Sequence, residues 1–255
     1  MHVMNDNNIS FPIRLNRYLY LNGFCSRREA DRLIEKGLVK VNGKKVKLGH
    51  KLEKKEDRIE MPKSVRQEKS HKRYFLLHKP VGVVSHNPQN EEKSAEDYFQ
   101  SPELKKLRMA PLGRLDKASR GLMLFSNDGT IVDKLLNPKY EHEKEYVVSI
   151  DKRMTKEFFD KMEQGVKIER YKTKPTKVTK IDTRSFRIIL TEGKKHQIRR
   201  MCAALGYQVQ DLKRTRIMNL RLGKMKPGSY QEVTGLELLT FLQSIGAIQK
   251  KTKKK

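Results

Sequence analysis

The feature that most constrains the fold of this chain is an uninterrupted apolar run at residues 121–126 (GLMLFS), between two segments rich in turn-forming residues. A run of this length without a charged residue is typical of a strand that is buried on both faces. Asn127, Asp128 and Gly129 follow as a turn, and Asp128 is a candidate N-cap for a helix that ends before Pro138. The sequence therefore predicts a central strand followed by a short helix.

A single carboxylate, Asp116, lies in the segment GRLD just before this strand. A loop that is anchored to a rigid strand can hold one side chain in a fixed position, and Asp carboxylates serve as nucleophiles in covalent catalysis. The alternative is a turn aspartate that pairs with Arg114 or Lys117, because turns are a common position for Asp. These residues alone leave both interpretations open.

The composition indicates a polyanionic partner. The 57 Lys and Arg residues outnumber the 30 Asp and Glu residues and give a formal net charge of +27, which favours nucleic acid over an anionic membrane. No apolar run approaches the roughly 20 residues of a bilayer span, and no signal peptide is visible, so we expect a soluble cytoplasmic protein. Cys25 and Cys202 are too few for a disulfide framework. We expect buried thiols and no metal site.

The chain divides into segments of different composition, and its 255 residues are enough for one large and one small domain. The small domain has the pattern of two short helices and a hairpin, with a capping box at Ser26 and Glu29 and a turn at Asn42-Gly43. The predicted segments are a flexible N-terminus at 1–12, the small domain at 13–61, a linker at 62–72, the large domain at 73–246 and a basic disordered tail at 247–255.

The large domain has interleaved strand and helix patterns. Alternation over residues 145–150 places Tyr146 and Val148 on one face of a strand. Val233 and Leu238 are a candidate staple, and Thr234 and Glu237 a candidate capping box, at the start of a final helix. Further strands are expected near 74–77, 176–181 and 185–190, and further helices at 155–164 and 198–205.

The stretch GRLDKASRGLMLFSNDG at residues 113–129 closely resembles the signature of the pseudouridine synthases of the RsuA and RluB/RluF type. In that family the Asp of GRLD is the catalytic residue, so the resemblance implies this role for Asp116. Ser119 and Ser126 stand where Thr is more usual, and each keeps the hydroxyl. The segment HKPVG resembles the family's first motif with His78 in place of Asn, and we expect His78 to be a structural hydrogen-bonding residue.

Two further motifs of the family have counterparts in the large domain. KEY at residues 144–146 resembles the second motif and implies that Tyr146 lies against the target uracil; the alternative is a core tyrosine. EGKKHQIRRM at 192–201 resembles the third motif and implies that Arg199 pairs with Asp116; the alternative is a surface arginine. The resemblance therefore implies a catalytic set of Asp116, Tyr146 and Arg199.

Residues 13–46 resemble the S4-like RNA-binding domain, although a basic segment of this kind is also typical of a plain solvated face. KRTRIM at 213–218 resembles the family's basic RNA-facing turn between two strands. The predicted RNA-contacting residues are Arg114, Arg27, Arg28, Arg32, Lys79, Arg200, Arg214 and Arg216.

The resemblance covers residues 13–60 and 73–245. It implies an α+β fold: a small S4-like α/β domain, then a catalytic domain with a mixed, largely antiparallel sheet flanked by helices. It also implies a cofactor-free isomerisation of a specific uridine to pseudouridine in structured RNA. We expect a monomer acting on large-subunit ribosomal RNA, with transfer RNA as the alternative.

Two alternatives belong to other classes of function. A noncatalytic RNA-binding protein of ribosome assembly could use the same basic surfaces, and its function would not depend on Asp116. An unrelated RNA enzyme such as a methyltransferase is disfavoured, because no Gly-rich cofactor loop follows a strand.

Overall fold

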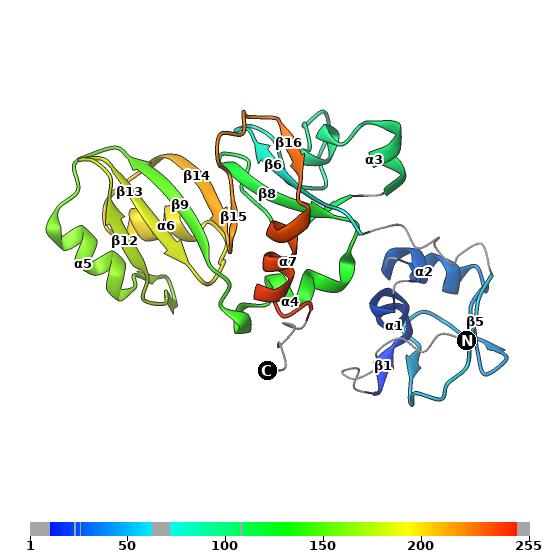
Figure 1. The fold of residues 1–255 in the computed structure, drawn as a ribbon. Helices are drawn as coiled ribbons and strands as arrows, with labels where there is room; N and C mark the ends of the chain where they lie inside the picture. The colour runs from blue at the N-terminus through cyan, green and yellow to red at the C-terminus, as the bar shows by residue number, and fades with distance from the viewer. Residues whose placement is uncertain (1–10, 23, 26, 63–71, 108, 249–255) are drawn as a thin grey trace, which may run out of the picture. The chain divides into compact units, whose positions relative to one another are not determined.

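The structure is a computed structural model, and the chain divides into two compact units, Met1–His71 and Lys72–Lys255 (Figure 1). Four predictions fall at least partly outside the described residues: the N-terminus through residue 10, the Ser26 cap, the linker at 63–71 and the tail at 249–255. The residues that the structure describes are 11–22, 24–25, 27–62, 72–107 and 109–248, with only the backbone of Leu21.

The first unit is built from two helices and short paired strands, as its pattern predicted. Asn42 and Gly43 have φ of 51° and 78° and connect β2 to β3, because the tight two-residue turn needs left-handed residues. Leu15, Leu19 and Ala30 lie in its core with no exposed surface. The elements are β1 (Ile13–Arg14), α1 (Leu15–Leu21), α2 (Arg27–Glu35), β2 (Lys40–Val41), β3 (Lys44–Lys45), β4 (Lys51–Leu52) and β5 (Ile59–Glu60).

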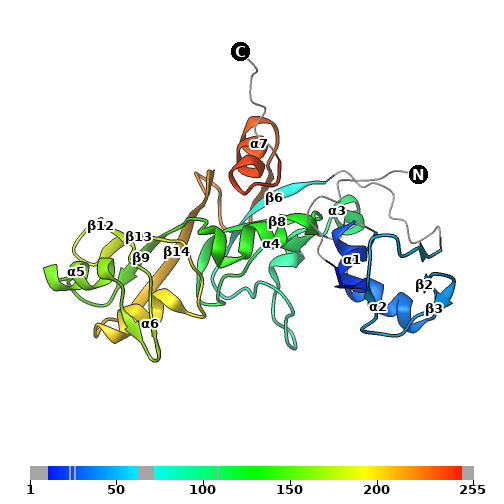
Figure 2. The same cartoon turned by 90° about the horizontal axis from the view of Figure 1, so that it is seen from below.

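The second unit is organised around a nine-stranded mixed sheet (Figures 1 and 2). All pairings are antiparallel except that of β8 with β14, which is parallel. β15 (Leu220–Arg221) pairs with β14, and β7 (Ala110–Pro111) pairs with β8. The other strands, in spatial order, are β12 (Lys177–Lys180), β13 (Ser185–Leu190), β9 (Lys144–Ile150), β14 (Val209–Ile217), β8 (Arg120–Ser126), β6 (Tyr74–Lys79) and β16 (Tyr230–Glu232).

Helices and short helical turns cover the sheet. Asp128 accepts a hydrogen bond from the Thr130 amide and caps the turn before α4, as predicted. The capping box predicted at Thr234 is wrong, because that side chain makes no capping hydrogen bond. The helical elements are η2 (Ala95–Tyr98), α3 (Pro102–Leu107), η3 (Gly129–Ile131), α4 (Val132–Leu136), η4 (Pro138–Tyr140), α5 (Lys156–Gln164), α6 (Gln197–Ala204) and α7 (Gly235–Ser244). A two-stranded ribbon, β10 (Lys167–Ile168) and β11 (Tyr171–Lys172), follows α5.

The core of the second unit follows the two halves of the sheet. β9, β12, β13 and β14 pack against α5 and α6 in one hydrophobic cluster. β8 is buried on both faces, as its apolar run predicted: Leu122 and Leu124 face the cluster with α4 and α7, while Met123 and Phe125 face the cluster with η2 and α3.

The parallel contact between β8 and β14 is unusually close. Gly121 pairs with Arg214 and has φ of +111°. A Cβ at this position would lie 2.3 Å from the Arg214 carbonyl oxygen and 2.6 Å from its nitrogen. Only glycine fits, and the contact places Arg214 directly beneath the loop that precedes β8.

Candidate active site

Asp116 and Tyr146 line the same cleft, of about 620 Å³, in the second unit. The loop before β8 contributes Asp116, and the segment before α6 forms another wall. Tyr146 lies on β9 and is paired with Arg214 on β14, so the two side chains share one face of the sheet.

The loop that carries Asp116 is held by side chains and backbone from several distant segments. The Ser85 hydroxyl donates to the Leu115 carbonyl at 2.6 Å and accepts from the Leu115 amide at 2.8 Å. The Gly82 amide donates to the Lys117 carbonyl at 2.9 Å. Within the loop, the Ser119 amide donates to the Asp116 carbonyl at 2.9 Å.

The far end of this loop is held by an ion pair. Arg120 donates to both carboxylate oxygens of Asp211, at 2.8 and 2.7 Å. A bidentate guanidinium–carboxylate pair fixes orientation as well as distance. The loop is therefore rigid before any substrate arrives, which is what positioning a reactive carboxylate requires.

The Asp116 side chain lines the cleft and is 37% exposed. The Nε2 atom of His196 lies 3.5 Å from its Oδ1 atom. His196 has φ of +52° and immediately precedes α6, so this left-handed residue turns its ring toward the loop. The sequence assigned no role to His196, and its only signal was its place within the segment EGKKHQIRRM.

Arg199 does not contact the Asp116 carboxylate, contrary to the predicted ion pair. Its guanidinium donates to the Ala118 carbonyl at 2.9 Å and to the Val209 carbonyl at 3.1 Å. It therefore holds the backbone two residues beyond Asp116. The helical position was correctly predicted, but the guanidinium reaches carbonyl oxygens of the loop and of β14 before it reaches the carboxylate.

Two lysines of the second unit have lowered pKa values because they are removed from water. The ammonium of Lys79 is fully buried and donates to the Pro80 and Val83 carbonyls at 2.8 and 2.7 Å. Burial lowers the pKa of Lys79 to about 8, with Asp116 opposing and Arg214 adding to the shift. Burial, with a contribution from Arg214, also lowers the pKa of Lys144 to about 8.

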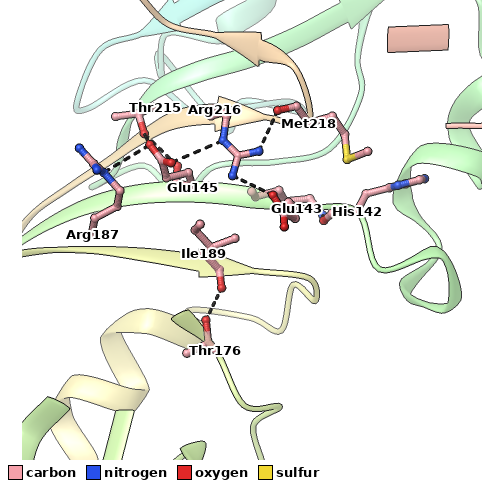
Figure 3. A network of polar contacts seen from close by, with 10 residues as sticks. His142, Glu143, Glu145, Thr176, Arg187, Ile189, Thr215, Arg216 and Met218 are labelled. Atoms are coloured by element: carbon pink, nitrogen blue, oxygen red, sulfur yellow. Dashed lines mark hydrogen bonds and ion pairs between the residues drawn. The ribbon is translucent and has the colours of Figure 1, made fainter. Parts of the chain in front are cut away.

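Three predicted RNA contacts, Lys79, Arg214 and Arg216, are not on the surface. Lys79 and Arg214 are 0% and 3% exposed, so neither presents its charge to an RNA backbone. The segment 213–218 is not a turn but lies mostly in β14. Arg216 is held by Glu143 at 2.9 Å and Glu145 at 3.5 Å (Figure 3), and these carboxylates neutralise it.

The remaining predicted contacts are accessible. Arg114 is exposed at the cleft, and Arg200 is one-third exposed beside Glu169, at 2.8 Å. Arg27, Arg28 and Arg32 are exposed on α2 of the first unit. His78 is buried, with Nδ1 2.8 Å from the Met225 carbonyl oxygen, as expected of a structural residue.

Within the described residues, no group of three or more His, Cys, Asp and Glu side chains could hold a metal ion. The same part of the chain contains no helix that is long and apolar enough to cross a membrane.

Comparison with known proteins agrees with this architecture. The model of the RNA pseudouridylate synthase family matches residues 73–204, and the S4 domain model matches residues 13–59. The chain belongs to the RNA pseudouridylate synthase family. It is a pseudouridine synthase with an N-terminal S4 domain, as the motifs predicted.

Individual relatives cover nearly the whole chain. The dual-specificity RNA pseudouridine synthase RluF of Escherichia coli (strain K12) is 40% identical over 235 residues, 91% of this chain and 79% of the relative. Ribosomal large subunit pseudouridine synthase B of Bacillus subtilis (strain 168) is 38% identical over 234 residues, 88% of this chain and 93% of the relative. A crystal structure of a pseudouridylate synthase is 28% identical, with a TM-score of 0.66, over 91% of this chain and 99% of that one. The predicted α+β fold, with its mixed and largely antiparallel sheet, is confirmed.

Proposed function

We propose that this enzyme isomerises a specific uridine of large-subunit ribosomal RNA to pseudouridine, as a cytoplasmic monomer. The names of two relatives, a ribosomal large subunit synthase and a dual-specificity RNA synthase, support ribosomal RNA as the substrate. The dual-specificity relative keeps transfer RNA as the second candidate substrate.

The observation that carries the catalytic proposal is Asp116 on a clamped loop, facing the same cleft as Tyr146. In the reaction the C1′–N1 bond of the uridine breaks, the uracil turns, and C5 bonds to C1′. Asp116 acts on the ribose, either as a nucleophile at C1′ or as a base. Tyr146 offers an aromatic face on which the flipped uracil stacks.

Arg199 has the role of a positioning residue in this proposal. Its two hydrogen bonds join the Asp116 loop to β14. A displacement of about 1 Å at a reacting group can cost about 10²-fold in rate, so a loop held at this point contributes to catalysis without touching the substrate.

The first unit supplies affinity in this proposal. S4 domains bind RNA, and Arg27 and Arg28 are exposed in the first turn of α2, where backbone amides also favour an anion, while Arg32 is exposed in its last turn. Contacts of this kind fix the position of an RNA without reading its bases. Arg114 would meet RNA at the mouth of the cleft.

The test is a map of pseudouridines in ribosomal and transfer RNA from a strain that lacks this enzyme. We expect one large-subunit site to lose its pseudouridine, to regain it with the wild-type chain, and to remain unmodified with Asp116→Asn. The amide keeps the shape of the carboxylate but loses the reactive oxygen, and we expect turnover to fall at least about 10³-fold. Restoration by Asp116→Asn would contradict the enzymatic role and favour a noncatalytic assembly protein.

A further inference from the structure

The sheet face at the bottom of the cleft carries two cations, Lys144 and Arg214, without carboxylate partners. No ion pair to either side chain is found within the described residues. Glu192, the other carboxylate in the cleft lining, is already bonded to the Gln197 side-chain amide at 2.6 Å, the Lys174 backbone amide at 3.1 Å and the Tyr171 hydroxyl. Lys144 and Arg214 therefore line the cleft without an ion-pair partner, and Asp116 is the other carboxylate of the lining.

Arg214 is 3% exposed and only partly satisfied. Its Nε donates to the Leu122 carbonyl at 2.7 Å, and its Nη1 donates to the Arg114 carbonyl at 3.2 Å. Its Nη2 is buried and has no hydrogen-bond partner. A buried, unpaired nitrogen on a guanidinium costs free energy unless something supplies an acceptor.

Lys144 is the second cation of this floor. Its ammonium donates to the His142 carbonyl at 3.1 Å, which leaves two of its three hydrogens available. Burial lowers the pKa of Lys144, and the positive charge of Arg214 adds to the shift. Two cations held together without a counter-ion are typical of a site that receives negative charge.

The strand register puts both cations beside the proposed stacking platform. Arg214 is the cross-strand partner of Tyr146, which places their Cβ atoms about 5 Å apart. Lys144 precedes Tyr146 by two residues on β9, so it lies on the same face about 7 Å away. Both line the cleft with Tyr146. The edge of a uracil ring stacked on Tyr146 lies within reach of both charges.

The reaction produces negative charge at that edge. When the C1′–N1 bond breaks, its electron pair leaves with the uracil and is delocalised over N1 and the carbonyl oxygens O2 and O4. After the ring turns, the pair at C5 forms the C5–C1′ bond; C5 then loses its proton and N1 carries one, so composition is unchanged. Between the two steps the detached ring is an anion that must be retained.

We propose that Lys144 and Arg214 stabilise the detached uracil anion by donating to its carbonyl oxygens. The inference rests on the proposed function and deepens it: Asp116 acts on the ribose from the loop, and the two cations act on the base from the sheet. Charge that exists only after bond cleavage is stabilised more than the neutral uridine, so the effect falls on the chemical step rather than on binding.

The test uses single-turnover kinetics of the full chain with the mapped RNA. For Lys144→Gln we expect the rate at saturating enzyme to fall about 10²-fold, the typical loss for one oxyanion donor, with the half-saturating concentration changed less than about threefold. Arg214→Lys keeps the positive charge but loses the planar guanidinium with its several N–H donors. Its single-turnover rate should fall less than that of Lys144→Gln. Lys180→Gln removes one charge from the exposed strand β12 and serves as the matched control.

Substrate atoms then decide whether the contact is direct. RNAs carrying 2-thiouridine or 4-thiouridine at the target replace one carbonyl oxygen by a weaker acceptor. We expect one of these RNAs to lower the rate of the wild type and of the Lys180→Gln control by a factor at least about five times larger than in Lys144→Gln. The reason is that Lys144→Gln already lacks the contact that the sulfur atom weakens. Equal factors in the wild type and in Lys144→Gln for both RNAs would overturn the proposal, as would a loss confined to binding.

The proposed function fails in a different way. If the wild type forms no pseudouridine, or Asp116→Asn still forms it, the enzymatic assignment falls and this inference with it. Lys144→Gln alone decides the inference if Arg214→Lys does not fold, because Lys144 holds no part of the Asp116 loop.

Discussion

Gly121→Ala tests the close contact on which the architecture of the active site depends. The added Cβ would lie 2.3 and 2.6 Å from backbone atoms of Arg214, whereas such contacts are never found below about 3.0 Å. Neither strand can retreat without breaking the β8–β14 pairing, because both lie inside the sheet. The φ of +111° alone costs about 1–3 kcal/mol for a side chain. With the clash, we expect a loss on the order of 4–5 kcal/mol, a large part of a typical 5–15 kcal/mol.

Two matched variants separate the backbone strain from the clash. Gly246→Ala has a positive φ of 65° but open space, so it reports strain alone and should cost about 1–2 kcal/mol. Gly193→Ala has neither a positive φ nor a neighbour within 4 Å, and should change stability by less than about 1 kcal/mol.

The assay is urea unfolding of the full chain followed by far-UV circular dichroism, because the sequence contains no tryptophan. Hydrogen exchange of peptides from β8 and β14 then locates the loss. If the unfolding free energies of Gly121→Ala and Gly246→Ala differ by less than about 1 kcal/mol, and hydrogen exchange in β8 and β14 is unchanged, the reasoning from the close contact is refuted.

Three further predictions concern the loop, a buried charge and the first unit. Arg199→Met should slow single turnover by about tenfold or more and raise hydrogen exchange at 114–119, because the loop loses its contact with the guanidinium. The acid limb of the pH–rate profile should not move, and a shift of that limb would instead support an ion pair between Arg199 and Asp116. Lys79 has a folded pKa of about 8 against the ordinary 10.5, so its burial costs stability below pH 8 and the cost is relieved as pH rises toward 10.5. The unfolding free energy of Lys79→Met minus that of wild type should therefore fall by on the order of 2 kcal/mol from pH 7.5 to 9.5, and a constant difference would contradict a buried ammonium. Removing residues 1–62 should weaken RNA binding and lower the slope of log K against log salt by about 0.7–0.9 for each lost phosphate contact, while the rate at saturating RNA persists; equal slopes would show that this unit does not touch the RNA.

The parts of the fold that were predictable are those with a local physical cause. Residues 121–126 read as a doubly buried strand because the run is apolar on both faces, and the two hydrophobic clusters on either side of β8 confirm it. Asn42-Gly43 predicted a hairpin because the turn needs two left-handed residues. Asp116 and Tyr146 were placed in one site by family motifs rather than by periodicity.

The parts that could not be predicted depend on distant partners. Arg214 was predicted to be an exposed cation because nothing local shows the Leu122 carbonyl that accepts its hydrogen bond, about 90 residues away. Lys79 was also predicted to be exposed, although its acceptors, the Pro80 and Val83 carbonyls, are local, because the sequence does not show that the whole of β6 is buried. Helical periodicity predicted the position of Arg199 on its helix, but it does not show which acceptors the guanidinium contacts, the Ala118 and Val209 carbonyls. Thr234 and Glu237 have the spacing of a capping box, yet the chain enters α7 without using it.

The position of β14 in the sheet has a consequence for synthesis on the ribosome. β6 and β8 emerge and can pair by residue 126, and β9, β12 and β13 can pair by residue 190, as two separate local assemblies. The strand that joins them, β14, is completed only at Ile217. A nascent chain that has paused before this point therefore holds Asp116 in one assembly and Tyr146 in the other, without the strand that pairs with both β8 and β9. Catalytic competence is acquired late in translation, long after the RNA-binding unit has left the exit tunnel.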